Sequence, residues 1–507
     1  MNATYKITIL TLILLFLFSV SVSALDSQNI YPGYRNSIYL ANTDPSVVQY
    51  KVLTASDKLA GDEFGLSVAI SEDCIIIGAP SADRAGIRDA GMVYFYQKDK
   101  GGKDEWGESA RIASPEKENG SFFGISVAIS SDYAIIGSRK QVSDKTSNTG
   151  AAYICHRTSD GNWKIVAEVK PSGENIRNNF GNSVSISGDY AIVGANTGSS
   201  DEIKAGAAYI FRREGDSPDR WKQIAVLNSS SPERSDYFGY STGISGDYAI
   251  VGAPTADAMP IFTGRDRIYI FNKNKGGEDK WGQVAEIGSP EPDETVWFGN
   301  SVAISGDCAI AGAWYAEMGD FYYPGVAYIL SKDAEGDGNW SITTSILPSG
   351  SYDCDNFARA VSISGDSALA GATGADPAGS SGGNAGAAYI YRKETGTAGS
   401  WDLVAGINAS VPLKEDYFGM SVSISGDYAI IGTSGADPDG VDRAGATYLF
   451  VIENKSSEEI PPTEYQKGSP AGNTAAETAE TCPVAGFPAF FTGLTAIFMT
   501  LLFYRKR

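Results

Sequence analysis

Histidine is nearly absent from this sequence, and closely spaced cysteines are lacking. The chain of 507 residues has one histidine, His156, so it cannot build a three-histidine zinc site or a pair of histidines acting as acid and base. The five cysteines lie far apart with no C-x-x-C pair, which argues against a zinc ribbon or a disulfide framework. One or two disulfide bridges stay open as an alternative, but we do not expect the fold to depend on them.

Basic residues are also scarce. The chain has 40 Lys plus Arg against 61 Asp plus Glu, which gives a formal net charge of -21. A negative charge of this size opposes binding to the phosphate backbone of a nucleic acid. We therefore expect no nucleic-acid partner.

Long apolar runs occur only at the two ends of the chain. Residues 7–23 are apolar and are followed by a cleavage point expected after Ala24, which is typical of a signal peptide over residues 1–24. Residues 484–504 carry no charge and precede the basic end 505–507, which is typical of a transmembrane helix whose basic end stays inside the cell. We therefore predict an exported protein that is anchored in the membrane and displayed on the cell surface.

Between these ends the sequence divides into three parts. Residues 25–45 form an N-terminal segment, residues 46–453 a repetitive domain, and residues 454–483 a segment rich in Ser, Thr, Pro, Glu and Ala that we expect to be a disordered stalk. An exported protein could carry glycans on its Asn-x-Ser/Thr sequons. These sequons begin at Asn119, Asn228, Asn339, Asn408 and Asn454.

The domain is built from seven copies of one unit. Each copy opens with Phe, followed by Gly in six copies and by Ala358 in the remaining one, at spacings of 57 to 61 residues. An alternating run such as Ser-Val-Ser-Ile-Ser, a continuous apolar run, and two short segments rich in Tyr, Ile, Val and Trp follow, which favours four strands per copy. The opening residues are Phe64, Phe123, Phe180, Phe238, Phe298, Phe357 and Phe418.

Four strands per copy and seven copies predict an all-β, seven-bladed β-propeller. Six tryptophans mark the fourth strands, and no equivalent follows the last third strand. The missing strand is expected at the start of the domain, from Val47 to Leu53. Closing the ring with strands from both ends removes the open sheet edges that invite aggregation.

The hairpins between the first and second strands are expected to be tight. In copies three to seven the link is Ser-Gly-Asp, whose glycine can adopt the positive φ of a two-residue II′ turn. Copies one and two have Glu72 and Ser131 at the glycine position, so we expect a different turn type there.

The motif resembles the FG-GAP repeat, which builds the seven-bladed propeller of integrin alpha subunits. The resemblance is carried by Phe-Gly before the first strand, by Gly-Ala-Pro at residues 78–80 and 252–254, and by a glycine before most third strands. It implies an extracellular adhesion or ligand-binding head. It also implies binding on the face formed by the loops that join strands two to three and four to one.

Calcium is the one cofactor that this resemblance raises. Calcium-binding integrin-like copies carry a long acidic loop between the first two strands, which supplies several oxygen ligands. The short Ser-Gly-Asp links do not, so we predict no cofactor, with calcium as the alternative. The candidate metal ligands are Asp437, Asp439 and Asp442 in the last copy, where a solvated turn is the competing interpretation.

The C-terminal end resembles an archaeal surface-protein sorting tail. In such tails a Pro-Gly-Phe tripeptide precedes an apolar helix and a basic end, and the helix is replaced by a lipid. This chain has Ala485-Gly486-Phe487 at that place. A retained transmembrane anchor is therefore the alternative.

Functional residues are expected where the copies differ. The fifth copy has an unusually aromatic loop between its second and third strands, and the neighbouring fourth copy has a longer apolar loop. Clustered aromatic side chains favour contact with a protein or a glycan, although the loops could instead bury one another. The candidate ligand-binding residues are Trp297, Trp314, Tyr315, Phe321, Tyr322, Tyr323 and Phe262.

Three classes of function are compatible with the sequence. We favour a surface protein that binds or adheres to a protein or glycan ligand, with a structural component of the cell envelope as the alternative. Acidic residues in the loops from fourth to first strands, from Asp62 to Asp416, are expected to form a solvated rim. A propeller hydrolase or lyase is less favoured. The first strands should line the central channel, and we expect no copy to have a charged residue in its first strand.

Overall fold

The computed structural model describes one repetitive domain. The described residues are 46–140, 150–172, 179–196, 205–232, 236–255, 266–291, 296–317, 323–333, 339–348, 355–377, 379–380, 383–394 and 399–453. The predicted signal peptide, N-terminal segment, stalk and transmembrane helix all lie outside these residues. Within the described ranges, no helix is long and apolar enough to cross a membrane.

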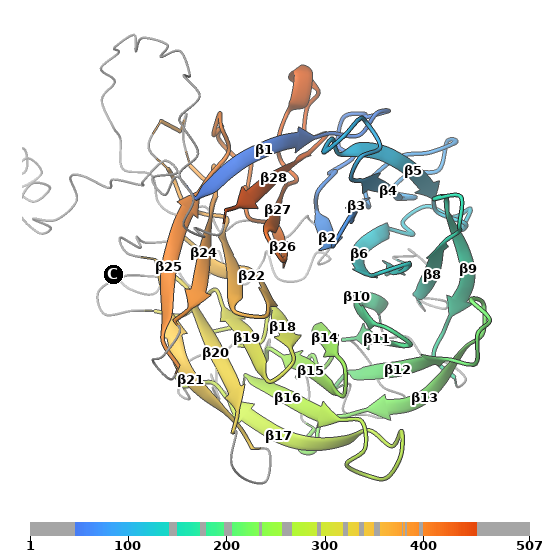
Figure 1. Ribbon diagram of the computed structural model, residues 1–507, viewed down its shortest axis with the longest axis vertical. Coiled ribbons are helices and arrows are strands. Elements are labelled where there is room, and N and C mark those ends of the chain that lie inside the picture. Colours follow the sequence, from blue (N-terminus) through green and yellow to red (C-terminus); the bar gives the residue numbers. More distant parts are fainter. Residues whose placement is uncertain are drawn as a thin grey trace, which may run out of the picture. The chain divides into compact units, whose positions relative to one another are not determined.

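The domain is a ring of seven four-stranded antiparallel sheets (Figure 1). The prediction of a seven-bladed propeller is therefore confirmed. Blades 1 to 3 consist of β2 (Ser67–Ser71), β3 (Cys74–Ala79), β4 (Met92–Gln97) and β5 (Gly107–Ala113); β6 (Phe123–Ser130), β7 (Tyr133–Ser138), β8 (Ala151–Arg157) and β9 (Trp163–Val169); and β10 (Phe180–Ser187), β11 (Tyr190–Ala195), β12 (Ala207–Arg213) and β13 (Trp221–Leu227).

The remaining blades repeat this order from the centre of the ring outward. Blades 4 to 6 consist of β14 (Ser241–Ser245), β15 (Tyr248–Ala253), β16 (Arg267–Asn272) and β17 (Gly282–Gly288); β18 (Val302–Ser305), β19 (Cys308–Ala313), β20 (Val326–Lys332) and β21 (Trp340–Ile346); and β22 (Phe357–Ser364), β23 (Ser367–Ala372), β24 (Ala387–Lys393) and β25 (Trp401–Ile407). Blade 7 consists of β26 (Ser421–Ser425), β27 (Tyr428–Thr433), β28 (Ala446–Ile452) and β1 (Val47–Leu53), with a short 3₁₀ helix, η1 (Pro438–Gly440), between β27 and β28.

Blade 7 closes the ring with strands from both ends of the domain. β1 pairs antiparallel with β28, in a register that sets Val47 opposite Ile452, and the two strands lie side by side in Figure 1. The backbone N–H of Glu453 donates to the carbonyl of Ser46, 2.5 Å away, where the two chain ends meet. The expected closing strand is thus confirmed.

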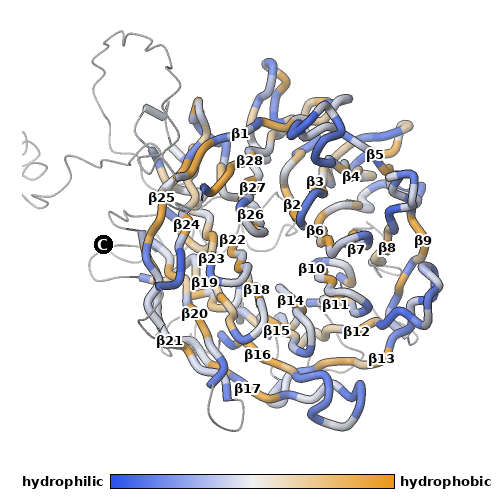
Figure 2. Tube along the Cα trace, viewed as in Figure 1, coloured by the Kyte–Doolittle hydropathy of each residue, from blue (hydrophilic) through white to orange (hydrophobic). Residues whose placement is uncertain are grey.

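Apolar strands and close backbone contacts hold the blades together. The second strands are buried on both faces, and in Figure 2 the strands carry much of the apolar colour while the outer loops are mostly polar. Glycine near the end of the second strand lets the next blade approach, because a Cβ on Gly194 would lie 2.1 Å from the carbonyl oxygen of Gly239. The same approach recurs around the ring, which explains why Phe-Gly and the later Gly-Ala occur together in the repeat.

Tryptophans of the fourth strands add a second inter-blade contact. Trp281 packs edge-on against Tyr190, the first residue of the second strand of the preceding blade, with ring centroids 6.0 Å apart. Trp106 makes the corresponding contact with Tyr428 of blade 7, at 5.6 Å, across the closure of the ring. Because each blade needs its neighbour to bury these rings, the propeller is one cooperative unit.

The first hairpins are more uniform than the sequence suggested. Gly188 has φ of 56°, and Glu72 and Ser131, at the same position of blades 1 and 2, have φ of 49° and 52° in two-residue turns of the same register. The expectation of a different turn type at these two residues is therefore wrong. A tertiary bond explains the result for Ser131, whose N–H donates to the Oγ of Ser71 in the preceding blade, as the glycines in later blades do to the equivalent serines.

The aspartate at the second position of each of these turns also has a structural partner. The Asp132 carboxylate accepts a 2.7 Å bond from the Nε of Arg157 at the end of the third strand, and Asp307 pairs with Lys332 at 2.9 Å in blade 5. The backbone carbonyls of the same aspartates accept bonds from the strand-three residue. The recurring aspartate therefore ties the first hairpin to the third strand.

Cysteine bridges make no contribution in the described residues. Cys74, Cys155 and Cys308 are free thiols. The other two cysteines, Cys354 and Cys482, lie outside the described ranges.

Candidate functional site

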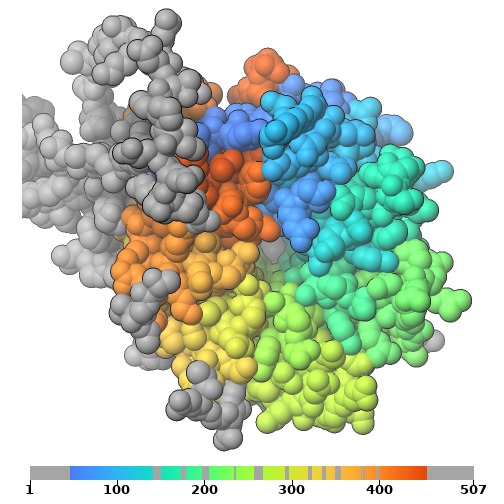
Figure 3. Space-filling view, in the orientation of Figure 1, coloured from blue at the N-terminus to red at the C-terminus, as the bar shows by residue number. Residues whose placement is uncertain are grey.

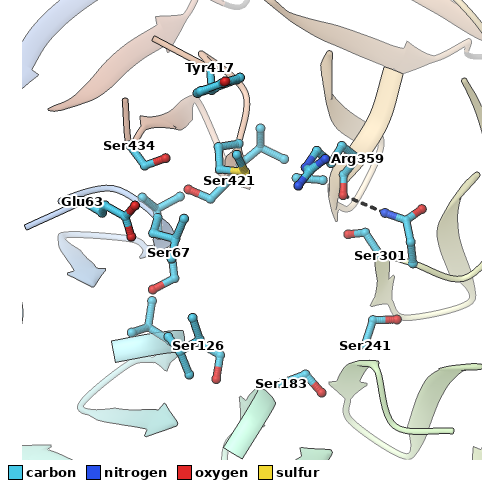
Figure 4. A pocket seen from close by; sticks show the side chains of 18 of the residues that line it. Glu63, Ser67, Ser126, Ser183, Ser241, Ser301, Arg359, Tyr417, Ser421 and Ser434 are labelled. Carbon is cyan, nitrogen blue, oxygen red and sulfur yellow. Dashed lines mark hydrogen bonds between the residues drawn. The ribbon is translucent and has the colours of Figure 1, made fainter. Parts of the chain in front are cut away.

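A cavity of about 820 Å³ occupies the centre of the ring at the face formed by the loops between strands two and three and between strands four and one. Figure 3 shows the ring hollowed at this place, and Figure 4 shows the side chains around the opening. The wall of the cavity is a ring of equivalent serines near the start of the first strands. These are Ser67, Ser126, Ser183, Ser241, Ser301 and Ser421.

Most of these serine hydroxyls donate a hydrogen bond to a backbone carbonyl of the next blade. Ser67 Oγ donates to the carbonyl of Gly124 at 2.7 Å, and Ser241 Oγ donates to that of Gly299 at 2.7 Å. Each such bond joins one blade to the next. The main role of the serine ring is thus to link neighbouring blades by hydrogen bonds.

The position just before each serine differs from blade to blade and also lines the cavity. It is occupied by Leu66, Ile125, Asn182, Tyr240, Asn300, Arg359 and Met420. Arg359 lies on β22, so the expectation that no first strand contains a charged residue is wrong. The pattern Phe-Ala-Arg-Ala at residues 357–360, in place of Phe-Gly-x-Ser, was the signal that could have revealed it.

Four of the predicted ligand-binding residues form a continuous aromatic cluster beside this cavity. Trp297 lies 6.0 Å from Trp314, Trp314 lies 5.2 Å from Tyr315, and Tyr315 stacks on Tyr323 at 3.7 Å, all measured between ring centroids. Tyr240 extends the cluster into the cavity wall, 6.0 Å from Trp297. All five side chains are half-buried.

The remaining predicted aromatic residues are not placed. Phe262, Phe321 and Tyr322 lie outside the described residues. Their contribution to the cluster stays a prediction.

A buried carboxylate holds the loop that carries Trp297. Asp266, which replaces the glycine found before other third strands, is fully buried and accepts bonds from the N–H groups of Thr255, Val296 and Phe298 at 2.8 to 3.1 Å. Burial raises the pKa of Asp266 to about 6, although the three N–H groups favour the charged form. Asp266 therefore positions the loop and does not reach a ligand.

Two half-buried arginines line the same cavity without a carboxylate partner among the described residues. The Arg359 guanidinium lies 5.2 Å from the ring centroid of Trp314, and Arg139, just after β7, donates to Asn182 Oδ1 at 3.4 Å. Neither forms an ion pair with a described residue, and burial lowers the pKa of both guanidinium groups. The charges of both also act on the Tyr240 phenol, which places the two cations near one aromatic residue.

Comparison with known proteins decides the family. The model of the FG-GAP repeat matches seven segments that together cover more than two thirds of the chain. The chain belongs to the FG-GAP repeat family. Among curated proteins no match is found. The matched segments are residues 47–96, 106–155, 163–211, 221–271, 281–330, 340–391 and 401–450.

The seven FG-GAP repeats and seven blades fit an integrin-alpha-like propeller. Each FG-GAP segment begins at a fourth strand, so the first one runs from β1 to β4 and straddles two blades. This offset is the reason that closure needs strands from both ends. The fold is typical of integrin-like proteins that are not enzymes, which by itself does not exclude an enzyme.

Several acidic residues of the loop face are buried in this FG-GAP propeller, whereas others, such as Glu118 and Glu415, are exposed as a solvated rim would be. Asp62 is 1% exposed and binds Arg84 at 3.0 Å. Glu116 and Glu291 accept bonds from the hydroxyls of Tyr153 and Tyr328 in the third strands, both at 2.8 Å. In these two blades the third-strand tyrosine is therefore tied to an acidic residue of the preceding loop.

The candidate metal ligands of blade 7 do not converge. The Asp437 carboxylate accepts the N–H of Arg443 at 2.7 Å, and Asp439 pairs with Lys58 at 2.9 Å. In the part of the chain that the structure describes, no three His, Cys, Asp or Glu side chains are grouped so that they could hold a metal ion. Calcium binding by Asp437, Asp439 and Asp442 stays a prediction without a preformed site to support it.

Proposed function

We propose that this FG-GAP propeller is a cell-surface binding or adhesion head that takes its ligand on the loop face of blades 4 and 5. The observation that carries the proposal is the cluster of Tyr240, Trp297, Trp314, Tyr315 and Tyr323 beside the central cavity. Family membership supports it, because an FG-GAP propeller is consistent with a ligand-binding or adhesion domain.

The chemistry of the cluster suits a protein or glycan ligand. Large aromatic side chains offer rigid apolar area and polar edges, and they lose little conformational entropy on binding. The cluster is also local, since the corresponding loop of blade 7 has no aromatic residue between β27 and β28. The regular blades form the scaffold, and the loops of blades 4 and 5 form the proposed contact surface.

Display outside the cell is the second part of the proposal. It rests on the sequence of residues 1–24, typical of a signal peptide, and of residues 484–504, typical of a membrane anchor. Replacement of that anchor by a lipid through a sorting tail is the variant that the Ala485-Gly486-Phe487 tripeptide suggests.

A binding screen tests the proposed function. The full-length chain, purified in a mild detergent, is applied to an array of glycans and to a panel of cell-surface proteins. We expect at least one specific signal that falls about tenfold or more in Trp297→Ala and in Trp314→Ala. Tyr50→Ala is the matched control, because Tyr50 is an aromatic residue 41% exposed on the outer strand β1, away from the cavity lining.

The melting temperature of each variant separates lost binding from lost folding. A signal that survives both tryptophan variants, or that falls equally in Tyr50→Ala, would move the binding surface elsewhere. No specific signal with any glycan or protein would count against a binding head.

A further inference from the structure

Only some of the charged side chains that line the central cavity form ion pairs with described residues. Glu63 pairs with Arg443 at 2.6 Å, and Lys414 pairs with Glu415 at 3.6 Å. Arg139 and Arg359 line the same cavity and form no such pair with a described residue. In a chain with 61 acidic and 40 basic residues, an unpaired cation in a cavity wall is not explained by a shortage of carboxylates.

The sequence around Arg359 is specialised at the cavity wall. Blade 6 has Ala358 where six blades have glycine, although this residue keeps the positive φ of 64°, which is unfavourable for a residue with a Cβ. It also has Ala360 where the other blades have the wall serine, so blade 6 lacks the hydroxyl used elsewhere to link neighbouring blades. Residues 358–360 therefore all differ from the repeat, and the middle one, Arg359, is the one charged residue on the first strands.

We propose that the cavity binds an acidic sugar, whose carboxylate is held by the Arg359 and Arg139 guanidinium groups and whose ring lies against Tyr240 in the cavity wall. The proposal deepens the proposed binding function and rests on it.

The geometry suits this class of ligand. A guanidinium presents a planar fork of donors that matches a carboxylate, and such charge-assisted bonds are stronger in a partly desolvated site than in water. The Trp314 ring, 5.2 Å from the Arg359 guanidinium, restricts the orientation of that fork before a ligand arrives. A cavity of about 820 Å³ has room for a short oligosaccharide.

Arg139 has few contacts with the described residues of the cavity wall. Its guanidinium donates one bond of 3.4 Å to Asn182 Oδ1 and lies 5.8 Å from the centroid of the Phe122 ring. Asn182 also donates to the carbonyl of Tyr240 at 3.2 Å, so the Arg139 side of the cavity is linked to the aromatic side by one amide.

Calorimetric titration with two matched sugars tests the inference. The full-length chain in a mild detergent is titrated with trigalacturonic acid and with its fully methyl-esterified, neutral form. We expect the acid to bind at least about tenfold more tightly than the ester, and this preference to shrink as salt is raised. Equal affinity for the two sugars, or no binding of the acid, would overturn the inference.

Two charge-removing variants and one control locate the site. Arg359→Met and Arg139→Gln should each weaken binding of the acid by about tenfold or more and leave binding of the ester unchanged. Arg88→Gln is the control, because the Arg88 guanidinium is 75% exposed and lies outside the cavity lining. An unchanged affinity in both variants would also overturn the inference.

Thermal unfolding of the sugar-free protein provides a readout that a structural arginine would not give. An unpaired cation held for a ligand destabilises the empty protein, so Arg359→Met should melt at an equal or higher temperature than the native chain. A clear fall in melting temperature together with unchanged affinity would assign Arg359 to the fold. If a ligand depends on Trp314 but neither on sugar charge nor on these arginines, the proposed function stands and this inference fails.

Discussion

The two faces of the same ring are built under different constraints. On the turn face, every first hairpin has two residues, a positive φ at its first position, and an aspartate tied to the third strand, even where Glu72 replaces glycine. On the loop face, Asp266 replaces a glycine and Arg359 appears in the cavity wall. The face that carries the first hairpins repeats its turn conformation in every blade, whereas on the loop face the wall serines and the backbone contacts recur and the residues beside them vary.

The backbone contacts of the loop face should be the most sensitive part of this arrangement. In Gly194→Ala the new Cβ would lie 2.1 Å from the carbonyl oxygen of Gly239, so blades 3 and 4 must separate. We expect a loss of about 3 kcal/mol in the free energy of unfolding, measured by urea denaturation.

Two other glycines calibrate that loss. Gly188→Ala, on the turn face, meets open space but keeps a φ of 56°, so it should cost about 1 kcal/mol. Gly288→Ala meets no atom within 4 Å and has no positive φ, so it should be nearly neutral. If Gly188→Ala proved as costly as Gly194→Ala, the contrast between the faces would be lost.

The loop face should also carry a pH dependence. Burial raises the pKa of Asp416 to about 6, from the value of 3.8 that is usual for an aspartate, and Asp416 is 4% exposed. A raised folded-state pKa favours the protonated form, so its stabilisation is fully present below pH 3.8 and is lost as the pH rises through about 6.

Asp416→Asn removes this titration and can still accept the N–H of Leu413, which Asp416 Oδ2 accepts at 2.9 Å. The stability of the variant relative to the native chain should therefore rise by about 2 kcal/mol between pH 4 and pH 7, measured by urea denaturation at several pH values. A difference that does not change with pH would show that the carboxyl group is charged throughout.

The smallest effect is expected on the turn face. Glu72 is exposed and has φ of 49°, which disfavours a residue with a Cβ. Glu72→Gly should raise the free energy of unfolding by about 0.5–1 kcal/mol, while Glu72→Ala, which keeps the Cβ, should not. Equal effects of the two substitutions in urea denaturation would point to the lost charge instead of the backbone.

The contrast between repeated local patterns and contacts between blades also explains which features the sequence could predict. The seven blades, the tight hairpins and the closing strand at Val47 were predictable, because a repeated pattern reports local periodicity seven times over. The conformation of Ser131 was not, because a bond to Ser71 of another blade sets it. The cluster of Trp297 and Trp314 was predictable as a loop anomaly, whereas Arg139 required the ring to bring distant blades to one cavity.

The closure of blade 7 has a mechanical consequence. The chain leaves the propeller after β28, which lies between β27 and β1 and is hydrogen-bonded to both. A pull on the chain beyond Glu453, directed along that strand, would have to shear two ladders at once instead of peeling one edge strand away. If the propeller is tethered through the residues beyond Glu453, as proposed, the load would pass through a strand that is paired on both sides.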